Sequence, residues 1–359
     1  MAQAASASSQ MAVTARKRLH TQFMRRGVIT AIMSGMTYGN YTAFMTLAMG
    51  MGIWQTWYGD NSGLSPFAAL FMLGALGAAM TDSCSAIWSL LLAARKGKVG
   101  DFFRTLKTKP GRIMIAAALI GGPLASTCYV LGLQLAGSII VPISALCPAI
   151  GTILSRFLYK QPLTPRMMLG IGICFAASFM IGLTGLEEGA PDNLFLGLFF
   201  GFLAALGWGL EGCVGGYSCS MIDSEIGITI RQCTSGLSNM IVLTPLFAII
   251  GGVSPIAMIG AAVTDIESLK WFVVAGFFAY FAFQLWYKGN AMCGTALGMA
   301  CNGMFSFWGP FFCWIYLGIV FGQEGWMLHP VVWVAAVVMV IGIFTIATNP
   351  LDFFRKKQN

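Results

Sequence analysis

The sequence predicts an all-α polytopic membrane protein with ten transmembrane helices, arranged as two inverted five-helix repeats with both termini in the cytoplasm. Three observations predict this class. Of the 359 residues, 57% are hydrophobic and only 9% are charged, against about 25% charged in soluble domains, and the mean hydropathy is +0.76. The chain contains ten long apolar runs, and its basic residues gather on one side of them.

Each apolar run can cross a hydrocarbon core of about 30 Å, which takes about 20 helical residues. A helix suits this environment because it satisfies its own backbone hydrogen bonds. The predicted spans are 27–50, 66–93, 113–135, 138–159, 165–186, 194–217, 229–250, 271–291, 294–321 and 329–349.

Lysine and arginine set the expected orientation. With the N-terminus placed inside, 20 of the 21 basic residues fall in the tails, in the inner connections or at the inner ends of the spans, and only Lys270 falls outside. Arg231, the third residue of the seventh span, is counted here with the inner connection between the sixth and seventh spans. The net charge of +8 is therefore expected to interact with the membrane surface rather than with a nucleic acid.

An internal repeat divides the ten spans into two halves. The first span contains MTYGNY and the sixth contains LGWGLE, so Tyr38 matches Trp208 and Tyr41 matches Glu211. Five spans per half require the second copy to be inverted, which is the architecture of secondary transporters with a site near the midplane. The predicted units are a mobile cytoplasmic tail (1–26), the first repeat (27–186), the second repeat (187–349) and a cytoplasmic tail (350–359).

Two acids lie deep within predicted spans, Asp82 in MTDSCS and Glu211 in WGLEGC. A charge at the bilayer centre costs about 2.5–3.5 kcal/mol on insertion scales, so it requires a partner or a function. No Lys or Arg is expected at similar depth. A protonated structural carboxyl or a helix cap is the competing interpretation, most of all for Asp82 with its polar neighbours.

Aromatic side chains accompany these acids. Trp208 lies three residues from Glu211 on one helix face, and Trp286, Tyr287 and Trp308 also lie within spans, where core packing is the competing interpretation. A quaternary ammonium has no N–H to donate and binds through cation–π contacts, with a carboxylate supplying the opposite charge. The pattern therefore predicts a binding site for a small cationic amine.

Four stretches resemble the drug/metabolite transporter superfamily of EamA type, and most closely its bacterial choline-uptake members. They are AALGWGLEGC (204–213), DSEIGITIRQCTSGLS (223–238), ALIGGPLAS (118–126) and ISALCPAIGTIL (143–154). The resemblance covers roughly residues 27–349, and the W-G-x-E and I-R-Q-x-T-S elements are its most specific parts.

The resemblance implies a carrier whose central pocket combines rings with acidic residues. It places Asn302 and Trp308 on an Asn-x5-Trp pattern of the ninth span, and it puts Tyr38 where Trp is more usual. The candidate substrate-binding residues are Glu211, Trp208, Asp82, Tyr38, Tyr41, Trp308, Asn302, Trp286 and Tyr287.

The expected function is import of choline or a related quaternary ammonium compound by alternating access, driven by the potential across a bacterial inner membrane. The alternative is an exporter of drugs or amino acids, with or without proton coupling. An enzyme, a cofactor and a metal site are not expected, because one histidine lies in the N-terminal tail and the other at the first residue of the tenth span, and no cysteine forms a C-x-x-C pair. The expected partners are the amine, the bilayer and at most a second copy of the chain.

Overall fold

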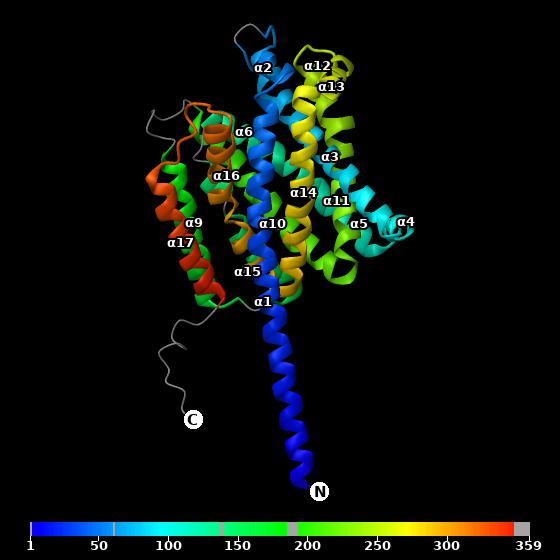
Figure 1. The fold of residues 1–359 in the computed structure, drawn as a ribbon, viewed down its shortest axis with the longest axis vertical. Coiled ribbons are helices and arrows are strands. Elements are labelled where there is room, and N and C mark those ends of the chain that lie inside the picture. The colour runs from blue at the N-terminus through cyan, green and yellow to red at the C-terminus, as the bar shows by residue number, and fades with distance from the viewer. Residues whose placement is uncertain are drawn as a thin grey trace.

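The computed structural model of the protein describes residues 2–59, 62–136, 140–144, 146–161, 163–184 and 193–347. These residues form a bundle of helices with no strand among them (Figure 1). The predicted boundary between the repeats, at residues 186 and 187, lies outside the described residues.

The first half begins with α1 (Ala2–Met49), which stands in the middle of the view in Figure 1 and extends far below the bundle. The predicted tail 1–26 thus continues α1 as a helix from Ala2 onward, and its mobility stays a prediction. The remaining elements of this half are α2 (Ile53–Tyr58), η1 (Ala68–Met72), α3 (Leu73–Arg95), α4 (Val99–Leu106), α5 (Lys109–Leu119), η2 (Ile120–Ala125), α6 (Ser126–Ala136), α7 (Ile140–Ser144), α8 (Cys147–Tyr159) and α9 (Pro165–Leu183).

The second half starts at α10, and its segments labelled η, like those of the first half, are π-helical turns within longer helices. Its elements are α10 (Leu194–Met221), α11 (Ser224–Ser238), η5 (Asn239–Leu243), α12 (Thr244–Ile250), α13 (Pro255–Thr264), α14 (Ile266–Cys293), α15 (Thr295–Asn302), α16 (Phe305–Cys313), η6 (Trp314–Val320) and α17 (Pro330–Ala347).

Eight helical stretches in the described part of the chain are long and apolar enough to cross a membrane. They are 68–95, 109–132, 165–183, 194–221, 224–250, 266–293, 295–320 and 330–347. The other two predicted spans, 27–50 and 138–159, correspond to the second half of α1 and to α7 with α8. The protein is therefore a polytopic helical membrane protein, and the count of ten spans stays a prediction.

Side-chain caps fix where several helices begin. Thr108, Thr164 and Ser254 each accept a hydrogen bond from the backbone N–H three residues later, and a proline follows each of them within two residues. Asp223 caps α11 in a similar way, accepting from the backbone N–H of Glu225 at 2.8 Å. Proline suits the first turn of a helix because a backbone N–H there would have no partner within the helix.

The helices pair in a pattern that relates the two predicted halves. The first predicted span (α1) packs on α14 and on α15–α16, and the sixth (α10) packs on α5–η2–α6 and on α8. The helix α3 packs against α11, and α9 lies beside α17 (Figure 1). If each predicted span is replaced by the span five positions away in the chain, the same set of contacting pairs results.

Candidate functional site

A buried ion-pair cluster lies where α3, α10 and α11 meet. The Arg231 guanidinium of α11 donates from Nε to Glu211 Oε1 of α10 at 2.8 Å. Its Nη1 lies 3.5 Å from Asp82 Oδ1 of α3. Arg231 is 1% exposed and Glu211 is fully buried, so water screens this contact little.

Neutral side chains surround the three charges. Tyr287 of α14 donates its hydroxyl to Glu211 Oε1 at 2.7 Å. Gln232 accepts from Arg231 Nη1 at 2.7 Å and donates to Ser85 at 2.5 Å. Asp82 accepts from the Ser235 hydroxyl and, at 3.4 Å, from Asn239. Polar groups buried in apolar surroundings require such partners.

One atom of the cluster is left out of this network. Glu211 Oε2 is buried and has no hydrogen-bond partner. It lies against Gly121 of η2, where an added Cβ would stand only 1.8 Å from it. The next residue, Gly122, approaches Ser235 in the same way. The two glycines therefore let η2 reach the charged cluster, and the π-helical turn includes Pro123, which lacks the N–H that a regular turn needs.

Aromatic rings from several helices surround the charges. The Arg231 guanidinium lies 3.7 Å from the centre of the Phe283 ring of α14, a cation–π contact. Tyr38 packs on Phe283, with ring centres 5.9 Å apart, and on Tyr41 at 5.1 Å.

A second group of rings extends the first. Trp208 of α10 donates its indole N–H to the Gly121 carbonyl at 3.0 Å and packs on Tyr129, with ring centres 5.0 Å apart. Trp286 stacks on Tyr287 at 5.1 Å. The predicted site residues Glu211, Asp82, Tyr38, Tyr41, Trp208, Trp286 and Tyr287 thus belong to one connected cluster.

The other two candidates, Asn302 and Trp308, pack against α1 next to this cluster. Asn302 donates to the Ser34 hydroxyl of α1 at 2.7 Å. Trp308 packs against the rings of Phe307, Phe311 and Phe312 and against α1 at Gly39. A role in substrate binding stays a prediction for these two residues and for the seven in the cluster.

Arg231 corrects the expectation that no basic residue reaches the depth of the two acids. A seventh span that begins at residue 229 puts Arg231 in its first turn, at the inner edge of the membrane. The Asp223 cap instead begins α11 at Ser224, which puts Arg231 seven residues, or about 10 Å, inside the helix. The aspartate followed by Ser-Glu before the apolar run was the signal that could have found this start.

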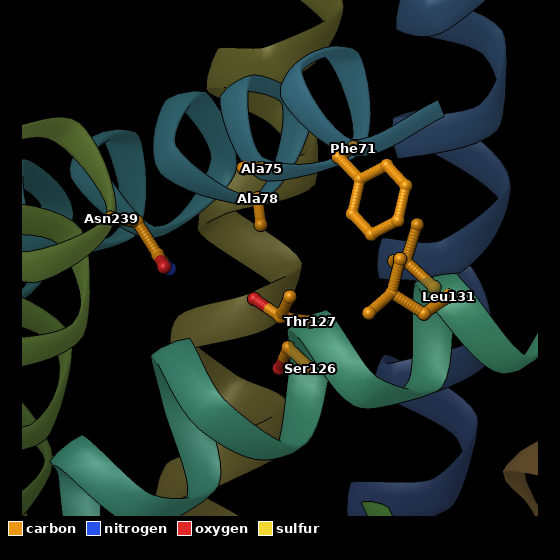
Figure 2. A pocket seen from close by; sticks show the side chains of 9 residues that line it. Phe71, Ala75, Ala78, Ser126, Thr127, Leu131 and Asn239 are labelled. Carbon is orange, nitrogen blue, oxygen red and sulfur yellow. The ribbon is translucent and has the colours of Figure 1, made fainter. Parts of the chain in front are cut away.

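A small pocket opens beside the cluster, between α3 and α6 (Figure 2). Its walls carry Phe71, Ala75 and Ala78 on one side and the Ser126 and Thr127 hydroxyls on the other. Asn239, which donates to Asp82, closes one end. The pocket has room for the centre of about one water, about 10 Å³.

The described residues contain no group of three or more His, Cys, Asp or Glu placed to hold a metal ion. The ten cysteines are free thiols, and each is buried or half-buried. The chemistry of the cluster is therefore that of charges, hydroxyls and rings.

Comparisons with known proteins give a fold and a distant relative. No family model matches the chain. Protein LicB of Haemophilus influenzae is 20% identical over 195 residues, which is 54% of this chain and 62% of LicB, so the chain spans less than two thirds of that relative. A solved crystal structure, described only as that of a protein, aligns with a TM-score of 0.57 at 16% identity. It covers 91% of this chain and 99% of the other, and at this identity it shows the fold alone.

Proposed function

We propose that the protein is a secondary transporter that imports choline or a related quaternary ammonium compound across a bacterial inner membrane by alternating access. The observation that carries this proposal is the meeting of Asp82 and Glu211, both buried, with a connected cluster of aromatic rings. The similarity to Protein LicB and the set of membrane-length helices support a transporter.

The charge of the cluster favours a monovalent cation. Two carboxylates and the Arg231 guanidinium sum to −1 when all three are ionised. A net buried charge is costly unless it is compensated, and one added cation would compensate it. A cation without N–H donors would gain about 0.5–2 kcal/mol from each ring face that it contacts, and Tyr38, Tyr41 and Trp208 are the half-buried rings of the cluster.

The helix pairing supports two halves that move against each other. In such transporters the halves alternately close the two ends of a path around a fixed site. At one end, Lys98 binds Asp223 and Glu225 at 2.7 and 2.9 Å. At the other end, Asp265 accepts from the backbone N–H of Ile53 at 3.0 Å. We assign the structure to an occluded state, in which each of these ties must open in turn.

The membrane potential can drive the import. A monovalent cation moving to the negative side gains about 2.3 kcal/mol per 100 mV, which corresponds to about 50-fold accumulation. A coupling ion is therefore not required.

Uptake into proteoliposomes tests the proposal. We expect radiolabelled choline to accumulate when a potassium diffusion potential makes the interior negative, and to leave when the potential is collapsed. Asp82→Asn is expected to lower the initial rate at least tenfold, because the site loses its net negative charge. Asp101→Asn removes a half-buried carboxylate of α4 that pairs with Arg104 outside the cluster, and it is the matched control. Failure of every quaternary ammonium to compete for uptake would reject the assignment.

Arg231 favours a second candidate, a carrier of amino acids, because a buried guanidinium can bind a substrate carboxylate. Against it, the guanidinium already contacts Glu211, Asp82 and Gln232 and lies over the Phe283 ring. The same assay separates the two: inhibition by amino acids but not by tetramethylammonium would support the amino-acid carrier.

A further inference from the structure

Arg231 makes the contacts that the proposed substrate needs. Its guanidinium pairs with the carboxylates of Glu211 and Asp82 and lies over the face of Phe283. A quaternary ammonium would use the same three kinds of contact, namely two carboxylates and a ring face.

We propose that Arg231 is a resident cation that occupies part of the substrate position in the substrate-free protein. The arriving ammonium replaces Arg231 as the partner of Asp82, while Arg231 stays paired with Glu211. This inference rests on the proposed function and deepens it, because it assigns different roles to the two carboxylates: Asp82 binds the substrate, and Glu211 holds the arginine.

The geometry separates the two carboxylates. The contact of Arg231 with Glu211 is a direct hydrogen bond of 2.8 Å from Nε, whereas Asp82 lies at 3.5 Å from Nη1. Glu211 also holds Tyr287 and is fully buried. Asp82 keeps other donors, the Ser235 hydroxyl and the Asn239 amide, when the arginine withdraws. Asp82 is therefore the carboxylate that Arg231 can release.

The pocket of Figure 2, which has room for about one water, lies on one side of Asp82, and we take this side as the direction of approach once the path widens. Asn239 both lines this pocket and donates to Asp82. The pocket walls are aliphatic and aromatic, with the Ser126 and Thr127 hydroxyls as further polar groups. Asn239, the partner of Asp82, lines the pocket and Glu211 does not, so an ammonium entering by this side is expected to meet Asp82 first.

Two cations cannot share the site at short range. Like charges a few ångströms apart repel strongly where the surroundings exclude water. Binding of the ammonium therefore requires Arg231 to move off Asp82. The cost of moving Arg231 weakens binding of the ammonium, and a variant without Arg231 should therefore bind the ammonium more tightly.

Binding measurements on purified protein in lipid nanodiscs test the inference, with choline and tetramethylammonium as probes in isothermal titration calorimetry. Asp82→Asn is expected to weaken binding at least tenfold. The double variant Glu211→Gln with Arg231→Gln keeps the site charge at −1 through Asp82, and it is expected to bind about tenfold more tightly because no resident cation must move. Asp101→Asn, on α4, is the matched control and should bind as the wild type does.

The outcomes separate this inference from the proposed function. If the wild-type protein binds neither probe, the proposed function fails and this inference fails with it. If the wild-type protein binds, but the double variant loses binding as Asp82→Asn does, Glu211 contacts the substrate and this inference alone is overturned. Should Asp82→Asn not fold, Asn239→Leu blocks the pocket side of Asp82 and is expected to weaken binding at least tenfold; unchanged affinity would contradict the assigned approach.

Discussion

Gly121 determines how closely η2 can approach the charged cluster. A methyl group at this position would stand 1.8 Å from Glu211 Oε2, and the helix α10 that carries Glu211 is packed against η2 along the adjoining turns. An alanine here must therefore displace either the carboxylate or the helix.

Gly121→Ala is expected to lower the stability of the protein by about 1–3 kcal/mol, the usual cost of overfilling a packed interior. Gly172→Ala in α9 is the matched control, since nothing lies within 4 Å of its added Cβ and alanine favours a helix by up to about 1 kcal/mol. Thermal unfolding in detergent, followed by tryptophan fluorescence, compares the two. Equal midpoints would contradict the close approach of η2.

The Arg231–Glu211 pair predicts an unequal response to single and double substitution. Glu211→Ala leaves a buried guanidinium without its nearest counterion and is expected to cost about 3–5 kcal/mol. The double variant Glu211→Leu with Arg231→Met removes both charges of this pair and is expected to recover part of the loss, because apolar side chains of similar volume can replace a buried pair and Asp82 keeps its Ser235 and Asn239 donors. Unfolding midpoints of the single and double variants measure the coupling. Additive losses would show that the two side chains act independently.

Among the elements, α11 connects the cluster to the end of the bundle that carries the basic loops. Its first turn is tied to the segment before α4, because Lys98 binds Asp223 at 2.7 Å and Glu225 at 2.9 Å, and Lys96 also binds Glu225. The same turn sets the register of α11, which places Arg231 at the cluster. A tie at the helix start can therefore affect the site inside.

The tie is expected to act across neutral pH. Partial burial alone would raise the pKa of Asp223, but its hydrogen bond from Lys98 and backbone N–H donors hold that pKa below its usual value. The hydrogen bonds to Asp223 and Glu225 raise the pKa of Lys98. The aspartate contribution is present above the ordinary carboxyl pKa of about 4 and is lost as the pH falls through its lowered value. The lysine contribution is present below about pH 10.5 and is lost as the pH rises through its raised value.

Lys98→Gln is expected to destabilise the protein by no more than about 1 kcal/mol, since these side chains are partly exposed and screened by salt. We expect a larger effect on choline transport. The inner end of the transport path should open more readily, and the dependence of the uptake rate on pH below about pH 4 should disappear. Lys107→Gln, an exposed lysine at the end of α4, is the control. Equal uptake rates and pH profiles for the two variants would show that the tie does not gate the path.

For the whole molecule, charge and architecture point to one orientation. The N-terminal extension of α1 and the Ala347 end of α17 lie at the same end of the bundle (Figure 1). Lys270, the one basic residue predicted outside, lies near the start of α14 at the opposite end. From the positive-inside rule we therefore predict that both ends of the chain lie in the cytoplasm.

Tags test this orientation. Epitopes before residue 1 and after residue 359 are expected to resist protease added to intact spheroplasts. An epitope in the turn at 322–326, where Gly322 and Gly325 have positive φ, is expected to be cut. Both end tags should become accessible when the membrane is opened with detergent. Cleavage of one end tag alone in intact cells would require an odd number of spans.

Most of the fold could be predicted from hydropathy, because a segment in lipid must be apolar over its whole length and this is visible locally. The match of Tyr38 and Tyr41 to Trp208 and Glu211 is also a local pattern, and the repeat that it suggests stays a prediction. The start of α11 was missed because hydropathy averages over a window, and the polar turn from Asp223 to Glu225 made the helix look shorter than it is.

The sequence by itself determined that this is a membrane protein of many helices and which acids lie inside them, because the apolar character of a segment and the position of a charge within it are both local properties. Only the tertiary structure decided what those acids meet. Arg231 comes from a different helix than Glu211 and Asp82, and its distance to each depends on the packing of α3, α10 and α11. Opposite charges far apart in sequence interact through space, so their pairing is fixed by how helices pack rather than by any one of them.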